Sequence, residues 1–365
     1  MISFLKLSSQ VVRPGLCTGC GACQGMCPYW VSYHGRTIEN YECNQKEGRC
    51  SRFCPRMPTD LAALREQFFD PADDIPQLGP VKGLYLVRAA APAENAQHGG
   101  VVTALVQLAL KEGLLDGAVL TRSQGGLDPE GVLVTTPEEV AACAGSSFQI
   151  PPTLAALNKA LIAGEKQSIG VVGTPCKTLA AYKMKADESG CGKAIGLVFG
   201  LFCGWGLDWE KLAALTAETA DAATLRHMDI PPSQYHRMDL TDAAGSHAVD
   251  LDKVLPLVRD TCRYCADMTA EFADISVGGG RSGDGWDTDR GWNQLIVRTR
   301  AGQQLLELAR AQGVLEFKDL PEGALDKLKK ASAGKKQKAM AALTQRFGSL
   351  GYLEPDRKQL EEATK

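Results

Sequence analysis

Cysteines crowd the start of this chain and constrain what it can fold into. Seven of the 13 cysteines fall between Cys17 and Cys54, in a segment punctuated by glycine and proline with little apolar periodicity. Such a segment cannot build a core from its side chains alone, so we expect an inorganic group to hold it together. Disulfide scaffolds are an alternative, but they are short and exported, and this chain is long with no export signal at its start.

The first four cysteines match a bacterial ferredoxin pattern. The spacing is C-x2-C-x2-C-x3-C-P, and its cysteines are Cys17, Cys20, Cys23 and Cys27. In this pattern three thiolates bind one [4Fe–4S] cluster and the fourth reaches a second cluster. Gly19 and Gly21 fit a crowded loop that needs positive φ. Zinc is the alternative, but zinc ribbons pair C-x2-C units across a longer gap.

The next three cysteines form an incomplete copy of this pattern, with Glu47 where a further cysteine is expected. By ferredoxin pseudosymmetry, the first cluster takes Cys17, Cys20, Cys23 and Cys54. The second cluster then has Cys27, Cys43 and Cys50. Its missing ligand could be Glu47 or another residue folded nearby. A three-iron cluster, or a single cluster with spare thiols, are the other possibilities.

A third ligand group is predicted from later cysteines. Its members are Cys176, Cys203, Cys262 and Cys265. Cys176 follows a strand and a turn at the start of a helix, where the thiol pKa is lowered and the ligand form is favoured. Each cysteine alone is typical of a small buried residue, and for Cys143 and Cys191 we keep that interpretation.

The chain beyond the cysteine-rich segment predicts a mixed α/β core. Strand-like and helix-like stretches alternate from residue 81, which is typical of a partly parallel sheet. We expect a ferredoxin-like 2[4Fe–4S] domain at 1–60, a linker at 61–80, an α/β domain at 81–320 and a helical tail at 321–365. The tail holds six lysines between Lys327 and Lys338. We interpret them as a solvated helix face, with a docking surface for an acidic partner as the alternative.

Composition excludes several classes of protein. The chain has 40 Lys and Arg against 43 Asp and Glu, a net charge of -3. It therefore lacks the excess of positive charge that is typical of proteins that bind nucleic acid. Its longest uncharged apolar run, residues 194–207, is broken by glycines, and a membrane span needs about 20 residues. We therefore expect a cytoplasmic protein with no membrane span.

Two glycine-rich stretches indicate a phosphate-bearing cofactor. Gly99 and Gly100 stand at the entry of an apolar helix, where free N–H groups attract an anion. Residues 278–285 end a strand in a loop that carries one arginine, Arg281. Each stretch alone is more often a simple turn.

In this order the motifs resemble those of the coenzyme F420-reducing hydrogenase/dehydrogenase beta-subunit family. The resemblance rests on the ferredoxin-like head, His98–Leu105, Gly173–Cys176, Phe202-Cys203, Cys262–Asp267 and Ala273–Gly278. It implies a flavin, mostly FAD, beside a [4Fe–4S] cluster held by the third ligand group. The residues that it suggests for flavin contact are Gly99, Gly100, Val101, Thr103, Ser146, Ser147, Thr174, Gly278, Gly279, Gly280, Arg281 and Gly283. For His98 a flavin contact, a helix cap and a purely structural place all remain open.

The combination predicts an iron–sulfur flavoprotein oxidoreductase subunit with two or three clusters. It would pass electrons between a diffusible two-electron donor or acceptor and a partner redox protein. The donor could be coenzyme F420, NAD(P)H or a partner-bound substrate, because similar chains serve several partners. The alternatives are a flavin-free adaptor like a polyferredoxin, a self-contained flavin-dependent reductase and a zinc-stapled structural protein.

Overall fold

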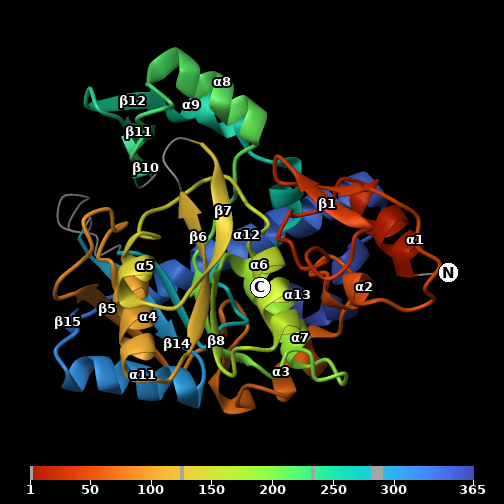
Figure 1. The fold of residues 1–365 in the computed structure, drawn as a ribbon, viewed down its shortest axis with the longest axis horizontal. Helices are drawn as coiled ribbons and strands as arrows, with labels where there is room; N and C mark the ends of the chain where they lie inside the picture. Colours follow the sequence, from red (N-terminus) through yellow and green to blue (C-terminus); the bar gives the residue numbers. More distant parts are fainter. Residues whose placement is uncertain (1–2, 124–126, 232–234, 281–290) are drawn as a thin grey trace.

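An eight-stranded mixed sheet forms the centre of the computed structural model, which describes residues 3–123, 127–231, 235–280 and 291–365 (Figure 1). In sheet order its strands are β15 (Leu315–Lys318), β5 (Gly83–Ala89), β14 (Asn293–Val297), β13 (Ile275–Gly279), β9 (Ile195–Leu201), β8 (Ile169–Gly173), β6 (Gly117–Ser123) and β7 (Pro129–Val134). The four neighbours β13, β9, β8 and β6 are parallel. Their carboxyl ends therefore share one edge, where ligands bind in sheets of this kind. The mixed α/β architecture that the sequence predicted is confirmed.

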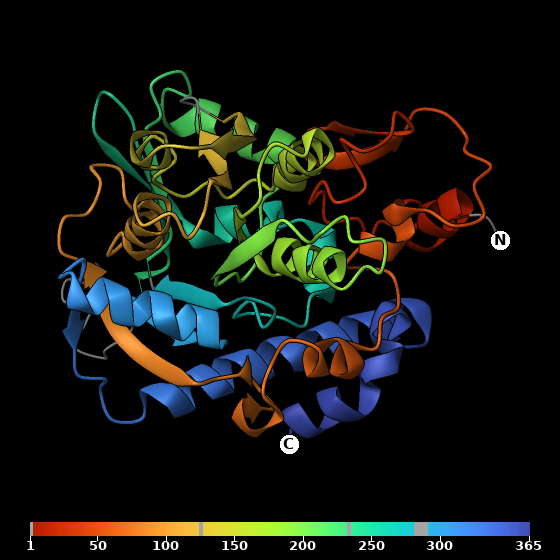
Figure 2. The ribbon, with the colours of Figure 1, turned by 60° about the horizontal axis from the view of Figure 1, so that its bottom comes forward.

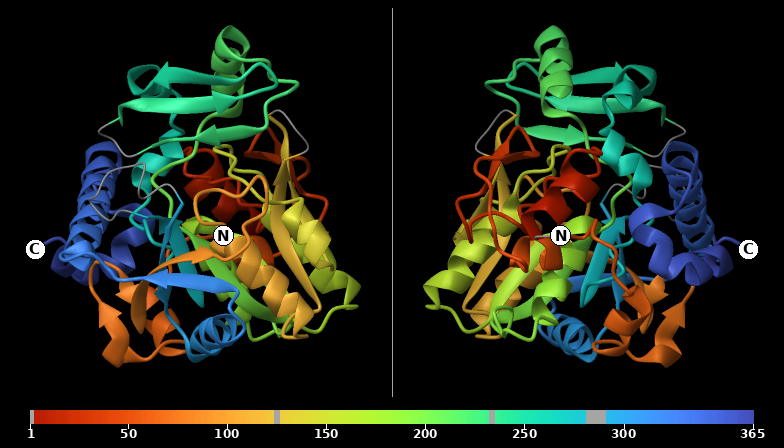
Figure 3. Two further views of the ribbon diagram at one scale, coloured as in Figure 1. Left: turned by 90° about the vertical axis from the view of Figure 1, so that its left-hand side faces the viewer. Right: turned by 90° about the vertical axis from the view of Figure 1, so that its right-hand side faces the viewer.

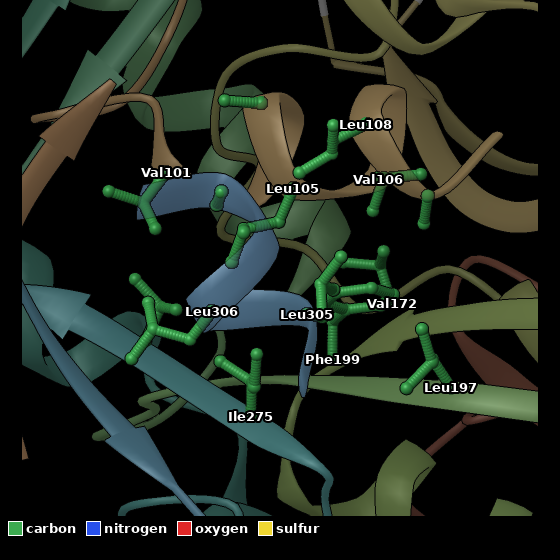
Figure 4. Close-up of a cluster of buried hydrophobic side chains, with 14 of the residues drawn as sticks. Val101, Leu105, Val106, Leu108, Val172, Leu197, Phe199, Ile275, Leu305 and Leu306 are labelled. Carbon is green, nitrogen blue, oxygen red and sulfur yellow. The ribbon is translucent and has the colours of Figure 1, made fainter. Parts of the chain in front are cut away.

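Helices cover both faces of this sheet. One face carries α4 (Val101–Lys111), α5 (Pro137–Ala141) and α11 (Arg300–Ala311), and the other α3 (Leu61–Glu66), α6 (Thr153–Ala163) and α7 (Pro175–Lys185). Figure 4 shows Leu105 and Leu305 meeting Phe199 in the first of these two cores. Val171 and Val172 point into opposite cores, because successive strand residues face opposite sides.

A small lobe is inserted between β9 and β13. It contains α8 (Trp209–Thr219), β10 (His227–Asp229), β11 (Arg237–Thr241), β12 (Ser246–Asp250) and α9 (Leu251–Val254), followed by the short helices η4 (Leu255–Leu257) and η5 (Asp260–Tyr264). The three strands are antiparallel and pack on α8 through their own apolar cluster, which includes Leu212, Met238 and Leu240. Figure 3 shows this lobe standing apart from the main sheet.

The two ends of the chain pack against each other. The N-terminal part has α1 (Ser3–Leu7), η1 (Ser8–Val12), the hairpin β1 (Trp30–Tyr33) with β2 (Arg36–Glu39), and α2 (Arg49–Phe53). The C-terminal part has α12 (Ala324–Phe347), η6 (Gly351–Asp356) and α13 (Arg357–Ala363). Phe4 and Leu7 share an apolar cluster with Ala339 and Leu343 of α12, the long blue helix of Figure 2. No helix in the described ranges combines the length and the apolar character needed to cross a membrane.

The stretch between the cysteine-rich segment and the sheet carries structure of its own. After α3 it holds η2 (Pro71–Asp73) and the two short strands β3 (Asp74–Ile75) and β4 (Gly79–Pro80). Leu78 is fully buried and packs with Ile296 of β14. This stretch is therefore attached to the body of the protein along its length.

The lysine-rich helix α12 differs in part from its expectation. Lys327, Lys330 and Lys338 are exposed, as a solvated face requires. Lys336 instead is 3% exposed and contacts the Glu271 carboxylate. The solvated interpretation is wrong for Lys336, because α12 packs this side against the loop that follows η5.

Candidate cofactor site

The structure brings four cysteines of the N-terminal segment together. This first group consists of Cys17, Cys20, Cys23 and Cys54. Burial raises the pKa of the Cys23 thiol well above its ordinary value, and the other three thiols of the group raise it further. Burial also raises the pKa of Cys54 to about 11, partly offset by Lys183. These four thiols are the ones that ferredoxin pseudosymmetry assigned to one cluster.

A second group joins Cys27, Cys43 and Cys50. Burial raises the pKa of Cys27, and the thiols of Cys50 and Cys43 contribute to that rise. Glu47, considered as a further ligand, is exposed. The hydroxyl of Ser3 lies 3.5 Å from the Cys50 sulfur, so α1 covers this group from one side.

A third group lies at the junction of the main sheet and the loop after the lobe. It consists of Cys176, Cys203, Cys262 and Cys265. Burial raises the pKa of Cys203 to about 12, Lys335 opposes the rise, and the other three thiols add to it. The Gly206 N–H donates to the Cys262 sulfur at 3.3 Å, a bond that stabilises a thiolate.

The first and third groups adjoin each other. Burial raises the pKa of Cys20, and the Cys176 thiol makes the next largest contribution to that rise. The second group connects to the first through α2, which carries Cys50 and leads directly into Cys54. The first group therefore adjoins the third and is joined to the second along the chain.

The spacing of the thiols suits a group larger than one metal ion. A tetrahedral zinc ion with thiolate ligands needs sulfur atoms about 3.8 Å apart. Within the described ranges, which include all the cysteines, only His236, Asp250 and Asp252 place three ligand atoms within 4.8 Å of one another. The cysteines are free thiols. Their donor chemistry and wider spacing fit an iron–sulfur cluster better than zinc.

Two glycines shape the loop of the first group. Gly19 and Gly21 have φ of 74° and 88°, which confirms the positive φ expected from the motif. A Cβ at Gly21 would lie 2.6 Å from the carbonyl oxygen of Pro152, just before α6. The loop can approach the α/β body this closely only without a side chain there.

A pocket of about 350 Å³ opens at the carboxyl edge of the parallel strands. It is lined by most of the residues expected to contact flavin, namely His98, Gly100, Val101, Thr103, Ser146, Ser147, Thr174, Gly278 and Gly279. Gly99 and Gly280 are not among the lining residues, and a Cβ at Gly99 would lie 2.7 Å from Asn293 Oδ1. Arg281 and Gly283 lie outside the described residues.

Close ring packing against two glycines and the start of a helix shape the pocket. A Cβ at Gly278 would lie 2.1 Å from the ring of Phe202, and one at Gly279 would lie 3.0 Å from the His98 imidazole. α4 begins after Gly100, which has a φ of 67°, and α7 begins after Thr174. The first turn of α4 lines the pocket, and its backbone N–H groups are available for phosphate, whereas α7 begins with Pro175, which has no N–H, and the Lys177 N–H donates to the Thr174 carbonyl oxygen.

Several lining residues were not predicted from the sequence. They are Gln97, Cys143, Lys177, Arg226, His227, Asp229 and Asn293. Gln97 Oε1 and Asn293 Oδ1 are buried and accept no hydrogen bond from any described residue. The sequence could have indicated Lys177 as a site residue, because a cation in the first turn of a helix opposes the helix dipole and is therefore unusual there. The residues at and beside the short strand β10 show no sequence pattern that would have indicated them.

The pocket and the third cysteine group share a wall. Cys203 and Thr174 line the pocket, and the Thr174 hydroxyl lies 3.4 Å from the Cys176 sulfur. A ligand in the pocket would therefore lie beside the third group, with the first and second groups beyond it.

Comparison with known proteins identifies the family of the chain. Residues 84–158 match the family described as coenzyme F420 hydrogenase/dehydrogenase, beta subunit N-term, and residues 166–323 match the C terminus of the same subunit. The chain belongs to this beta-subunit family. The predicted resemblance is thereby confirmed.

Relatives in this family carry related names. The coenzyme F420 hydrogenase subunit beta of Methanococcus voltae is 30% identical over 69% of this chain and 90% of its own length. A subunit of the F(420)H(2) dehydrogenase of Methanosarcina mazei is 26% identical over 87% of this chain and 88% of its own length. The coenzyme F420-dependent sulfite reductase of Methanocaldococcus jannaschii is 27% identical over 88% of this chain, but over only 51% of its own length. These three relatives are thus named as oxidoreductases or as subunits of oxidoreductases.

A solved structure supports the fold. A chain of the F420-reducing [NiFe] hydrogenase complex from Methanosarcina barkeri matches with a TM-score of 0.67 and 24% identity. The match covers 74% of this chain and 94% of the other. At this identity the likeness concerns the fold alone.

Proposed function

We propose that this beta-subunit relative is an iron–sulfur flavoprotein that carries electrons between a two-electron donor or acceptor and a partner redox protein. The observation that carries the proposal is the shared wall between the pocket and the third cysteine group, with the first group adjoining the third. A ligand in the pocket would thus be the first member of a series of redox centres.

The residues present fit a flavin. The pocket volume lies in the range of small-molecule sites, and Gln97 Oε1 and Asn293 Oδ1 offer acceptors for ring or ribityl hydrogens. The start of α4 after Gly100 offers N–H donors for the phosphate groups of FAD. Gly278 and Gly279 allow the Phe202 and His98 rings to pack closely beside the pocket.

The thiol groups would hold the clusters. The first and third groups each offer four cysteines, the number that a [4Fe–4S] cluster requires. The second group offers three, so its cluster needs a further ligand or has fewer iron atoms. Hydrogen bonds from backbone N–H groups to sulfur, such as those to Cys54 and Cys262, would stabilise the bound thiolates.

The flavin and the clusters would have different tasks because of their chemistry. A flavin exchanges two electrons with an organic molecule, whereas a [4Fe–4S] cluster carries one at a time. Around the flavin, this chain would bind phosphate at the start of α4 and exclude water through Phe202 and His98, whose rings pack against Gly278 and Gly279. Arg226 and His227 of the lobe line the same pocket and would face the diffusible donor.

The partner would be another redox subunit. Relatives are named as subunits of hydrogenase and dehydrogenase enzymes, which supports a place in a larger complex. The second group, joined to the first along the chain, would face that partner's own centre. Coenzyme F420 is the first donor to test, followed by NAD(P)H.

Cofactor analysis of anaerobically purified protein tests the proposal. We expect FAD on release of the flavin, more than about four iron atoms per chain with matching sulfide, and little zinc. Iron with no flavin, after reconstitution with both, would favour the flavin-free adaptor. Zinc in place of iron would refute the proposal.

A second experiment distinguishes a subunit that passes electrons to a partner redox protein from a self-contained reductase. We expect coenzyme F420 or NAD(P)H to reduce the flavin in stopped-flow measurements, and affinity isolation of the native chain to recover a redox partner. Multiple turnovers with a small substrate and no protein acceptor would contradict the proposed electron transfer to a partner protein.

A further inference from the structure

Lys177 places a buried ammonium group beside the pocket. The residue is 4% exposed, and its Nζ donates to the Thr153 hydroxyl at 2.8 Å. The Thr153 hydroxyl in turn lies 2.8 Å from that of Thr121, at the end of β6. Lys177 also lines the pocket, and the thiols of Cys176 and Cys20 are the acidic groups that act on its charge most strongly. Its positive charge therefore lies between the pocket, the third group and the first group.

Two further lysines are placed in the same way. Lys183 of α7 donates to the backbone oxygen of Cys54 at 2.7 Å and to the Thr59 hydroxyl at 2.7 Å. Lys335 of α12 donates to the backbone oxygen of Cys203 at 2.6 Å. Both side chains are half-buried or more, and each points its ammonium group at a cysteine group.

These three lysines lack a carboxylate partner. In the part of the chain that the structure describes, no Asp or Glu oxygen lies within 4.0 Å of their ammonium groups. Lys336, one residue after Lys335, shows the usual arrangement, because its ammonium group contacts the buried Glu271. A buried charge without a partner is costly, so a fold that keeps three of them needs negative charge nearby.

We propose that Lys177, Lys183 and Lys335 are the counter-charges of the redox centres, each assigned by its position. This inference rests on the proposed function. Lys183 serves the cluster of the first group, Lys335 that of the third group, and Lys177 the pocket ligand together with the third group. A cluster with four thiolates is an anion, and each added electron increases its negative charge. A fixed ammonium group nearby makes that electron easier to add.

Redox titration of the loaded protein at one pH tests this inference. Cluster signals are followed by electron paramagnetic resonance and the flavin by visible absorption, with the first and third groups assigned through Cys54→Ser and Cys265→Ser. We expect Lys183→Met to lower the equilibrium constant for reducing the first-group cluster at least about tenfold, a shift of about 59 mV for one electron. Lys335→Met should do the same to the third group, and Lys177→Met to the flavin and the third group.

Matched variants separate charge from structure. Lys159→Met removes an exposed lysine of α6 and should leave each potential unchanged, because solvent screens its charge. Lysine-to-arginine variants keep the charge and should keep the potentials close to those of the unmodified protein. Where a methionine variant does not hold its clusters, the glutamine variant is titrated instead, and a failure of both while the arginine variant loads also supports a required charge.

Two results would overturn the inference. One is a full set of centres whose potentials do not change in the methionine variants. The other is an arginine variant that shifts as far as the methionine variant. Absence of clusters and flavin from the unmodified protein would instead refute the proposed function, so the two failures are distinguishable.

Discussion

Replacing Glu271 by glutamine should destabilise the protein strongly while changing almost nothing in shape. Glu271 is 3% exposed, and its two carboxylate oxygens contact Lys336 of α12 and Arg65 of α3. Its N–H donates to the Asp267 carboxylate at 2.9 Å, two residues after Cys265. One carboxylate thus joins two helices to the loop of the third cysteine group.

The magnitude follows from the burial of this network. Removing one partner of a buried ion pair costs about 3–5 kcal/mol, because the other charge stays buried without compensation. Glu271→Gln leaves two cations in that state, so we expect a loss near the upper end of this range. Lys336→Met is the matched control, because Glu271 then keeps Arg65, and we expect a smaller loss of about 1–3 kcal/mol.

The effect should depend on pH in a defined direction. Burial acts to raise the pKa of Glu271, but Lys336 and Arg65 outweigh it and hold the pKa below the ordinary value of 4.5. A lowered folded-state pKa contributes stability above the ordinary value, and that stability is lost as the pH falls through the folded-state pKa. The difference between the original chain and Glu271→Gln should therefore shrink in acid.

Urea unfolding followed by circular dichroism measures both quantities. The free energy of unfolding is compared at neutral pH and again in acid for the original chain, Glu271→Gln and Lys336→Met. A loss below about 1 kcal/mol for Glu271→Gln at neutral pH would refute the argument, as would a loss that does not shrink in acid.

Three further substitutions test the site. Cys265→Ser should remove one cluster signal and lower the iron content while the other cluster signals persist, and retention of every signal would contradict the third group. Gly21→Ala should loosen the N-terminal loop from α6, because a Cβ there has no room and φ is 88°, and limited proteolysis should show faster cleavage of this segment. Gly278→Ala should displace the Phe202 ring and lower the flavin content but not the iron content; Gly334→Ala, in α12 away from the pocket lining and with no atom within 4 Å of the new Cβ, should change neither.

The sequence alone was enough for features that depend on near neighbours. The spacing of Cys17, Cys20 and Cys23 within one tight loop already predicts that these thiols bind one metal cluster. The glycines between them have the expected positive φ. The alternation of strands and helices predicted from residue 81 onward is observed, for example in β5 (Gly83–Ala89) and α6 (Thr153–Ala163), because each is long enough to show its periodicity. The short strands β10 and β15 were missed, since three or four residues carry no period.

Part of the pocket lining was also predictable, where it comes from short sequence motifs. The residues from His98 to Thr103 and at Gly278 and Gly279 belong to motifs that a sequence displays. The lobe residues Arg226, His227 and Asp229 reach the pocket only because β10 folds over the carboxyl edge of the sheet. No local pattern specifies that approach.

Tertiary structure alone decided where the lysines lie. A run of six lysines indicates a solvated helix by its charge, and three of them are indeed exposed on α12. Lys335 and Lys336 turn inward because Ala339 and Leu343 fix that face of α12 against the N-terminal segment, more than 300 residues earlier in the chain. The contacts of Lys335 with Cys203 and of Lys336 with Glu271 follow from that packing. Such contacts depend on the summed burial of many residues from distant segments, which the spacing within any one segment does not encode.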